Sequence, residues 1–311
     1  MIGRTPLVRL HRFEREVPEG IELWAKAEWQ NPGGSVKDRA AARMILEGEA
    51  SGKLTPGRTI LDATSGNTGI AYAMVGAARG YSVKLCVPAN ASPERKLMLR
   101  ALGAELVLTN PLEGGTDGAI REARRMYAEN PDKYFYPDQY NNDANWRAHY
   151  DTTGPEILRD LPTITHFVAG LGTSGTLMGA GRFLREKVPD VSIVAAEPRY
   201  GELVYGLRNI DEGFVPELYD DSVLTSRYSV SSYDALRRTR DLIEAEGVFA
   251  GVSSGAALHV AMAVGERAVE AGVRADIAFV VSDGGWKYLS TGAYEGSLQQ
   301  AAERIEGQLW A

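Results

Sequence analysis

The sequence predicts an α/β fold whose strands are mostly parallel. Segments typical of strands and segments typical of helices alternate through most of the 311 residues, which is the pattern of α/β proteins with parallel sheets. Glycine-rich turns stand between a strand and the following helix at residues 64–69 and 170–176. Since open parallel sheets bind ligands at the carboxyl ends of their strands, these turns mark the expected functional edge.

The first half of the chain is expected to form a compact open-sheet unit. Gly80 and Gly103 stand where helix C-caps are expected, because glycine adopts the left-handed conformation of a cap without strain. The predicted elements are helix 40–50, strand 59–63, helix 70–79, strand 82–87, helix 93–102, strand 105–109 and helix 116–129.

The second half of the chain repeats the alternation of strand and helix. The predicted elements are strand 166–169, a helix ending near residue 186, strand 193–196, helices 232–245 and 254–268, and strand 277–281.

The composition excludes several classes of protein. The net charge is -7 and no dense block of lysine and arginine is present, which argues against nucleic-acid binding. No apolar stretch is long enough to span a membrane or to serve as a secretion signal. Cys86 is the single cysteine, so an intrachain disulfide is impossible. A buried structural thiol and a reducing cytoplasm are expected.

Lys37 is the candidate nucleophile. Residues 31–39 read Asn-Pro-Gly-Gly-Ser-Val-Lys-Asp-Arg, which places this lysine after a turn-rich loop and just before a helix. The positive end of the helix dipole disfavours its charged form, and only a neutral amine can form a Schiff base. A solvated surface charge is the ordinary alternative. Asp38 and Arg39 are expected to form a structural ion pair at the helix start.

The turn at residues 170–176 is predicted to hold a terminal phosphate, because a strand, glycine turn and helix aim backbone N–H groups at an anion. Glycines allow close approach, and three hydroxyls can donate. The turn also reads Gly-x-Gly-x-x-Gly, with Glu197 ending the next strand, which is the pattern of an NAD-dependent dehydrogenase. The hydroxyls and Lys37 favour the phosphate. The expected phosphate ligands are Gly172, Thr173, Ser174, Gly175 and Thr176.

Together these motifs resemble the cysteine synthases, which are pyridoxal-phosphate enzymes of the tryptophan synthase β-like fold (fold type II). The resemblance runs from Gly3-Arg4-Thr5-Pro6-Leu7-Val8 to Tyr288-Leu289-Ser290; relatives usually carry a leading segment before the first motif. It implies two open αβα lobes with the cofactor between them. A small mobile lobe, residues 35–140, would bind the substrate carboxylate, and a large lobe, residues 1–34 and 141–311, the cofactor phosphate. A homodimer and no metal are implied.

The resemblance also assigns roles to residues of the first half. Lys37 would form the Schiff base with the cofactor aldehyde and then remove the substrate α-proton. Asn67 matches the asparagine that contacts the cofactor ring hydroxyl. An N-cap run that merely starts a helix is the alternative for this loop. The residues that match ligands of the substrate carboxylate are Thr64, Ser65, Thr68 and Gln139.

Ser253 matches the residue that meets the pyridine nitrogen of the cofactor, in the loop at residues 251–256. A neutral hydroxyl does not hold this nitrogen protonated, which favours β-elimination and replacement over transamination. The adjacent Ser254 is the alternative contact, and both residues are also suited to be N-caps.

Two features resemble the actinobacterial branch that uses O-phospho-L-serine. Arg208 stands in the loop at residues 206–216, where relatives that use acetylserine tend to have small uncharged residues. The chain ends in a short apolar segment, residues 306–311. That branch takes sulfur from the thiocarboxylated C-terminus of a small ubiquitin-like carrier protein. A surface salt bridge and a packed last turn are the alternatives.

The predicted activity is therefore a pyridoxal-phosphate dependent β-replacement. O-phospho-L-serine and a sulfur donor, either carrier-protein thiocarboxylate or sulfide, would give L-cysteine and phosphate. O-acetylserine with free sulfide is the nearest alternative; a cystathionine synthase, a serine/threonine dehydratase and an NAD-dependent dehydrogenase are further ones. A non-catalytic docking protein is the remaining alternative, against which the intact Lys37, Asn67 and Ser253 argue.

Overall fold

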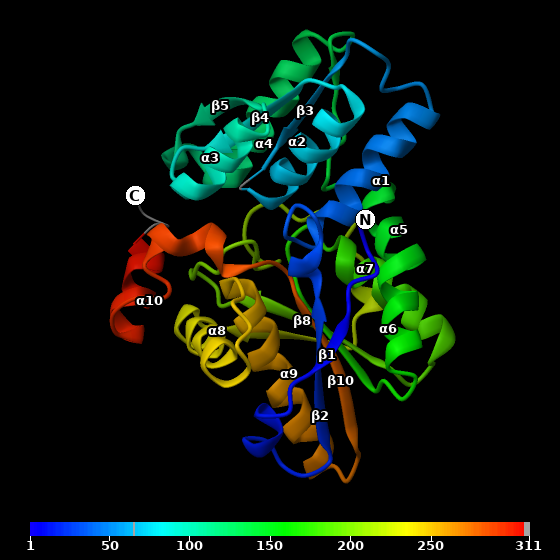
Figure 1. Cartoon of the computed structure of the whole chain (residues 1–311), viewed down its shortest axis with the longest axis vertical. Coiled ribbons are helices and arrows are strands. Elements are labelled where there is room, and N and C mark those ends of the chain that lie inside the picture. The colour runs from blue at the N-terminus through cyan, green and yellow to red at the C-terminus, as the bar shows by residue number, and fades with distance from the viewer. Residues whose placement is uncertain (65, 308–311) are drawn as a thin grey trace.

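Two separate sheets organise the chain, shown in Figure 1 as a computed structural model that describes residues 1–64 and 66–307. The larger sheet has six strands in the order β1-β2-β10-β7-β8-β9. Among its described strands, β1 pairs antiparallel with β2 and the other neighbours are parallel. The strands are β1 (Leu7–Arg9), β2 (Ile21–Ala27), β7 (His166–Gly170), β8 (Ser192–Pro198), β9 (Ser226–Val230) and β10 (Ala275–Val281).

The smaller sheet has four parallel strands in the order β5-β4-β3-β6. Its strands are β3 (Thr59–Ala63), β4 (Val83–Pro88), β5 (Glu105–Thr109) and β6 (Tyr134–Phe135). The predicted fold class, α/β with mostly parallel sheets, is therefore confirmed. All four strands lie inside the small lobe predicted for residues 35–140, while the limits of the two lobes stay a prediction.

Helices cover both sheets. The smaller sheet has α1 (Lys37–Ala50), α2 (Asn67–Arg79), α3 (Pro93–Ala101) and α4 (Gly115–Glu129) around it, in the upper half of Figure 1. The remaining helices are α5 (Asp143–Ala148), a π-helical turn (His149–Thr153), α6 (Gly154–Asp160), α7 (Gly175–Lys187), α8 (Ser232–Glu246), α9 (Val252–Glu270) and α10 (Leu298–Gly307). Short 3-10 turns lie at Phe13–Arg15, Glu28–Gln30, Pro111–Glu113, Asp221–Val223 and Gly285–Thr291.

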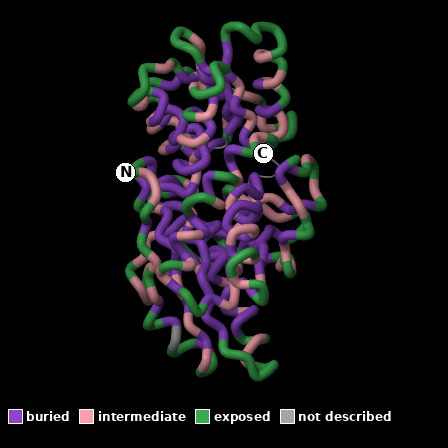
Figure 2. The backbone as a smooth tube through the Cα atoms, turned by 90° about the vertical axis from the view of Figure 1, so that its right-hand side faces the viewer, coloured by how far each residue is buried: buried purple, intermediate pink, exposed green. Residues whose placement is uncertain are grey.

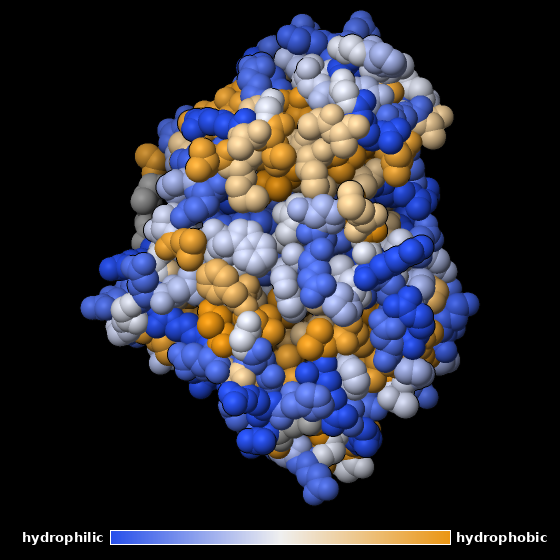
Figure 3. Space-filling view, viewed as in Figure 1, coloured by the Kyte–Doolittle hydropathy of each residue, from blue (hydrophilic) through white to orange (hydrophobic). Residues whose placement is uncertain are grey.

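Each sheet has its own hydrophobic core. Figure 2 shows buried segments running through the interior of both halves, with exposed segments at the periphery. On the face drawn in Figure 3, apolar side chains gather in an upper and a lower band, with hydrophilic side chains between them. Cys86 is buried, as predicted, and burial raises the pKa of its thiol to about 12, so the thiol is inert.

The expected ion pair between Asp38 and Arg39 is wrong. The Arg39 guanidinium instead lies 2.7 Å from carboxylate oxygens of both Glu28 and Glu156, and the Lys26 ammonium also lies 2.7 Å from Glu156. The Asp38 carboxylate accepts a backbone N–H at 2.5 Å. Buried charges need such partners, and the network ties the first turn of α1 to β2 and α6.

No helix within residues 1–64 and 66–307 combines the length and the apolar character needed to cross a membrane.

Candidate active site

Lys37 begins α1 directly beside the carboxyl end of β10. The N–H of Val36 donates to the carbonyl of Ser282 at 2.8 Å, and Ser35 forms an isolated bridge with Asp283. These contacts join the turn before α1 to the strand end in the middle of the six-stranded sheet. They place the candidate nucleophile at the edge where ligands of parallel sheets bind.

The Lys37 amine is suited to nucleophilic chemistry. It is half-buried, and within the described residues its Nζ makes no hydrogen bond or ion pair. Burial lowers the pKa of the amine, the Asp283 carboxylate opposes this shift, and the Lys287 ammonium adds to it. A lowered pKa enlarges the neutral fraction that can attack a carbonyl or accept a proton.

Asn67, the first residue of α2, is held between two buried charged residues. Its Oδ1 accepts from the Lys287 ammonium at 2.8 Å, and its Nδ2 donates to the Asp283 carboxylate at 2.7 Å. The Tyr288 hydroxyl also donates to Asp283 at 2.7 Å. A Cβ at Gly251 would lie 2.1 Å from the other oxygen of Asp283, so only glycine fits there.

The described members of the predicted carboxylate-binding set lie near the start of α2, where their side chains bond to other groups of the protein. The Thr64 hydroxyl accepts the N–H groups of Gly66 and Gly69 at 3.0 and 3.2 Å, which is helix-start capping. The Thr68 hydroxyl donates to Gln139 at 2.7 Å. Ser65 lies outside the described residues.

The predicted phosphate turn leads into the N-terminus of α7, a helix of 13 residues. Ser174 has a φ of 67°, a left-handed conformation that is uncommon for serine and worth a functional explanation. A Cβ at Gly175 would lie 2.0 Å from Oδ1 of Asn145, and one at Gly172 would lie 2.7 Å from the Gly206 carbonyl. Only glycine fits at these two positions. The turn ends at a helix N-terminus, the kind of place where anions bind.

Two residues that the sequence did not indicate complete this region. Nδ2 of Asn145 donates to the Gln139 carbonyl at 2.7 Å and to the Thr173 hydroxyl at 3.1 Å, so it joins the two predicted binding loops. Nε2 of His149 lies 3.4 Å from the Thr176 hydroxyl. Burial, together with nearby cations, holds the pKa of His149 well below its usual range, so its ring is neutral. It starts the π-helical turn, a feature often found at functional sites.

The structure separates Ser253 from Ser254. The Ser254 hydroxyl is fully buried and accepts the N–H of Ser282 at 3.1 Å. The Ser253 hydroxyl forms no hydrogen bond with any part of the chain that the structure describes. Gly251 rather than either serine is the N-cap of α9. Ser253 is thus the one of the two whose hydroxyl is open to a ligand.

Arg208 lies against two aromatic rings in the loop that follows β8. Its guanidinium carbon is 5.5 Å from the ring centre of Tyr140 and 5.8 Å from that of Phe214. It donates to the Phe214 carbonyl and, at 3.1 Å, to the carboxylate of Asp117 on α4. The side chain is only 15 % exposed. The pair that Arg208 forms with Asp117 is therefore not an ordinary, solvent-exposed surface salt bridge.

Glu197 does not have the surroundings of a ribose-binding carboxylate. Its oxygens accept the N–H of Ile210 at 3.1 Å and face the Arg227 guanidinium at 3.4 Å. Internal partners therefore hold the residue that a dinucleotide fingerprint would need.

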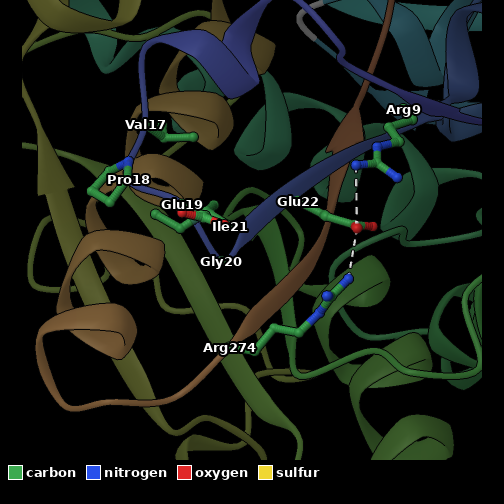
Figure 4. A pocket seen from close by; sticks show the side chains of 8 residues that line it. All are labelled: Arg9, Val17, Pro18, Glu19, Gly20, Ile21, Glu22 and Arg274. Atoms are coloured by element: carbon green, nitrogen blue, oxygen red, sulfur yellow. Dashed lines mark hydrogen bonds and ion pairs between the residues drawn. The ribbon is translucent and has the colours of Figure 1, made fainter.

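A separate hollow of about 430 Å³ lies at the amino ends of β2 and β10, opposite the edge that carries Lys37 (Figure 4). Two arginines on its wall, Arg9 and Arg274, both pair with Glu22, at 3.2 and 2.6 Å. None of the predicted site residues lines it. Its lining residues are Arg9, Val17, Pro18, Glu19, Gly20, Ile21, Glu22 and Arg274.

Comparison with known proteins places this geometry in a family. Residues 1–283 match the family model described as "Pyridoxal-phosphate dependent enzyme". The protein belongs to this family, and pyridoxal phosphate is its cofactor.

Two relatives narrow the class of enzyme. The chain is 46 % identical over 297 residues to a cysteine synthase of Aquifex aeolicus (strain VF5), covering 94 % of this chain and 90 % of the relative. It is 44 % identical over 294 residues to cysteine synthase B of Salmonella typhimurium (strain LT2), covering 94 % of each. It is therefore an enzyme of the cysteine synthase family.

Solved structures agree on the fold. The crystal structure of an O-ureido-L-serine synthase matches with a TM-score of 0.85 and 38 % identity over 95 % of both chains. That of a cysteine synthase (OASS) from Entamoeba histolytica matches with a TM-score of 0.86 and 33 % identity, covering 100 % of this chain and 94 % of that one. The dehydrogenase alternative is thereby set aside.

The residues present fit pyridoxal phosphate. Lys37 offers an amine and Ser253 a hydroxyl that have no hydrogen-bond partner among the described residues, and a glycine turn precedes the N-terminus of α7. These groups suit an aldehyde, a ring nitrogen and a phosphate, respectively. Their chemistry, an amine nucleophile, anion donors and a neutral ring contact, is the set that this cofactor requires.

Proposed function

We propose that the enzyme makes L-cysteine from O-phospho-L-serine by β-replacement. Arg208 carries this proposal, because a sheltered guanidinium in the loop after β8 suits a phosphate rather than an acetyl group. Its bonds to Asp117 and Phe214 use two of its five N–H donors, and the Asp117 side chain is 30 % exposed. A phosphate dianion can therefore reach the remaining donors and form charge-assisted, bidentate hydrogen bonds.

Each predicted residue has a proposed task. Lys37 binds the cofactor covalently, and Asn67 and Ser253 meet the ring oxygen and ring nitrogen. The substrate carboxylate is held by Thr64, Ser65, Thr68 and Gln139. The cofactor phosphate is held by Gly172, Thr173, Ser174, Gly175 and Thr176.

The proton transfers fall to Lys37. When bound, pyridoxal phosphate supplies an electron sink that acidifies the substrate α-carbon. The Lys37 amine accepts the α-proton, since its lowered pKa leaves it neutral in a larger fraction of molecules. The bond between the β-carbon and the phosphate oxygen breaks, and phosphate leaves with the electron pair. A sulfur nucleophile then bonds to the β-carbon, and Lys37 returns the proton to the α-carbon. Sulfide gives L-cysteine directly, whereas a carrier thiocarboxylate gives a thioester whose acyl–sulfur bond water must cleave to release L-cysteine and the carrier carboxylate.

The sulfur donor is proposed to be a thiocarboxylated carrier protein or sulfide, and the enzyme is proposed to act as a cytoplasmic homodimer. The apolar tail that suggested a carrier includes residues 308–311, which lie outside the described residues. Sedimentation of the purified protein measures its oligomeric state, and cysteine formation from each sulfur donor measures their relative use.

O-acetylserine with free sulfide is the second candidate. It is favoured by the likeness to the Entamoeba histolytica cysteine synthase (OASS) and by relatives named cysteine synthase. The deciding measurement is kcat/KM for phosphoserine and acetylserine on the same purified protein with sulfide as the nucleophile. Phosphoserine is expected to be better by at least about tenfold, the effect of about 1.4 kcal/mol. Equal or better use of acetylserine would refute the phosphoserine proposal and leave the family assignment untouched.

A further inference from the structure

Lys287 is a fully buried cation whose partners are all neutral. Its ammonium donates to the carbonyls of Gly33 and Gly34 at 3.0 and 2.9 Å and to Oδ1 of Asn67 at 2.8 Å. The side chain is 0 % exposed. Across residues 1–64 and 66–307, no carboxylate lies within ion-pair distance of it. The Asp283 and Asp38 carboxylates act on its charge from a greater distance. Burying an ammonium is costly, so a lysine bonded here only to neutral groups calls for an explanation.

The contacts of Lys287 and Asp283 fix the orientation of the Asn67 amide. Lys287 takes the oxygen end of this amide and Asp283 takes the nitrogen end. A flipped amide would set its N–H groups against the ammonium and its oxygen against the carboxylate, so both contacts would become repulsive. The Tyr288 hydroxyl bonds the same carboxylate oxygen of Asp283, which keeps that oxygen in place.

One N–H of Asn67 stays available for a ligand. An amide nitrogen carries two hydrogens, and Asp283 accepts one of them. We propose that Lys287 is a positioning residue of the cofactor site, which holds the oxygen of Asn67 so that the second N–H faces bound pyridoxal phosphate. This inference rests on the proposed contact between Asn67 and the cofactor ring oxygen.

Lys287 also ties that amide to the turn that carries the nucleophile. Gly33 and Gly34 precede Lys37 in the same turn, and their carbonyls share the ammonium with Asn67. Gly34 has a φ of 73°, so its carbonyl direction depends on a conformation that favours glycine. The same positive charge contributes to the lowered pKa of the Lys37 amine.

A double-mutant cycle tests the inference on the holoenzyme. Lys287→Met, Asn67→Ala and the double variant are compared by cofactor dissociation constant and by the visible circular dichroism of the bound cofactor. Loss of one oriented hydrogen bond is expected to weaken cofactor binding by about tenfold in either single variant. The double variant should bind no more weakly than Asn67→Ala alone, because Lys287 acts through Asn67.

Lys26→Met is the matched control. Lys26 is also 0 % exposed, but it bonds to Glu156 and to the Thr5 carbonyl and does not contact Asn67. It should lower stability and leave the visible circular dichroism unchanged. Lys287→Gln, which keeps a shorter neutral donor, replaces Lys287→Met in the cycle if the latter does not fold.

Two results would overturn the inference, and they differ. If Lys287→Met weakens cofactor binding by the same factor with and without Asn67, the lysine acts through the turn at Gly33 and Gly34 instead. If Asn67→Ala changes neither readout, the proposed contact of Asn67 with the cofactor fails together with the inference.

Discussion

The guanidinium of Arg208 and the carboxylate of Asp117 lie 3.1 Å apart and join the two halves of the molecule. Arg208 follows β8 of the six-stranded sheet, whereas Asp117 lies in the first turn of α4, which packs on the four-stranded sheet. Because the two charged groups face each other, an anionic substrate that binds the Arg208 guanidinium would compete with the Asp117 carboxylate.

Asp117→Asn should therefore improve the use of phosphoserine. Removing the competing carboxylate frees the guanidinium, and we expect KM for phosphoserine to fall by about threefold to tenfold with little change in kcat. Acetylserine should be unaffected, because it carries no dianion. Glu122→Gln on the same helix, where Glu122 pairs with Arg125, is the control. Equal changes in KM for phosphoserine and acetylserine would mean that Asp117 affects only the folding or packing of the protein.

Arg208→Ala should have the opposite effect: it should impair the use of phosphoserine and leave the use of acetylserine nearly unchanged. A charge-assisted pair with phosphate is worth roughly 1.5–3 kcal/mol, so kcat/KM for phosphoserine should fall by about tenfold to a hundredfold. Acetylserine should change little. Arg208→Lys should recover only part of the loss, because it lacks the planar fork. An equal fall for both substrates would make Arg208 a structural residue.

Lys37→Ala should abolish turnover and the covalent attachment of the cofactor. Loss of both nucleophile and base is expected to lower kcat by several orders of magnitude. Borohydride reduction followed by peptide mass spectrometry should find the cofactor on Lys37 in the wild type and on no residue in the variant. Lys133→Ala, at an exposed lysine just before β6, should keep both properties. Labelling at another lysine of the wild type would refute the assignment.

Ser253 and Ser254 should respond differently to replacement by alanine. Ser254→Ala loses the bond to the N–H of Ser282 and leaves this half-buried donor unpaired, which costs about 1 kcal/mol of stability. Ser253→Ala should leave the urea midpoint unchanged and shift the visible spectrum of the bound cofactor. A spectral shift confined to Ser254→Ala would move the ring contact to that residue.

Asp62→Asn should flatten the dependence of stability on pH. Burial raises the pKa of the Asp62 carboxyl to about 7, even though the Tyr72 hydroxyl donates to it at 2.8 Å. A carboxyl with a raised pKa binds its proton more tightly in the folded state. Its contribution is therefore full below about pH 4 and is lost as pH rises to about 7, on the order of 4 kcal/mol.

Urea unfolding at pH 5 and pH 8 measures this difference. The wild type should lose more free energy of unfolding between these values than Asp62→Asn does. Asp132→Asn, at an exposed aspartate, should behave as the wild type. Identical pH profiles for all three proteins would show that Asp62 ionises normally.

Local patterns predicted most of the fold, because a strand, a helix or a glycine turn depends largely on residues that are close together in the sequence. The predicted strand 105–109 matches β5, and helix 116–129 differs from α4 by one residue. β2 escaped prediction because its Lys26 faces the interior, where Glu156, 130 positions away, neutralises it. A pairing of that range leaves no local signal.

The site was predicted in its parts but not in its connections. Asn67 could be named from its loop, whereas its partners Asp283 and Lys287 lie 216 and 220 positions away. A signal for Asp283 did exist, since it follows a buried strand and precedes two glycines. Adjacent serines are equivalent in a sequence motif, and only the N–H of Ser282 tells Ser253 and Ser254 apart.

The Arg39 network decides which half of the enzyme carries the nucleophile. By residue number, Lys37 falls inside the predicted small lobe. Two positions later, however, Arg39 forms ion pairs with Glu28 and Glu156, which belong to the predicted large lobe. These ion pairs fix the first turn of α1 to the half of the molecule that contains the six-stranded sheet. If the four-stranded sheet moves relative to the six-stranded one, these ion pairs should keep Arg39, and with it Lys37, beside the six-stranded sheet.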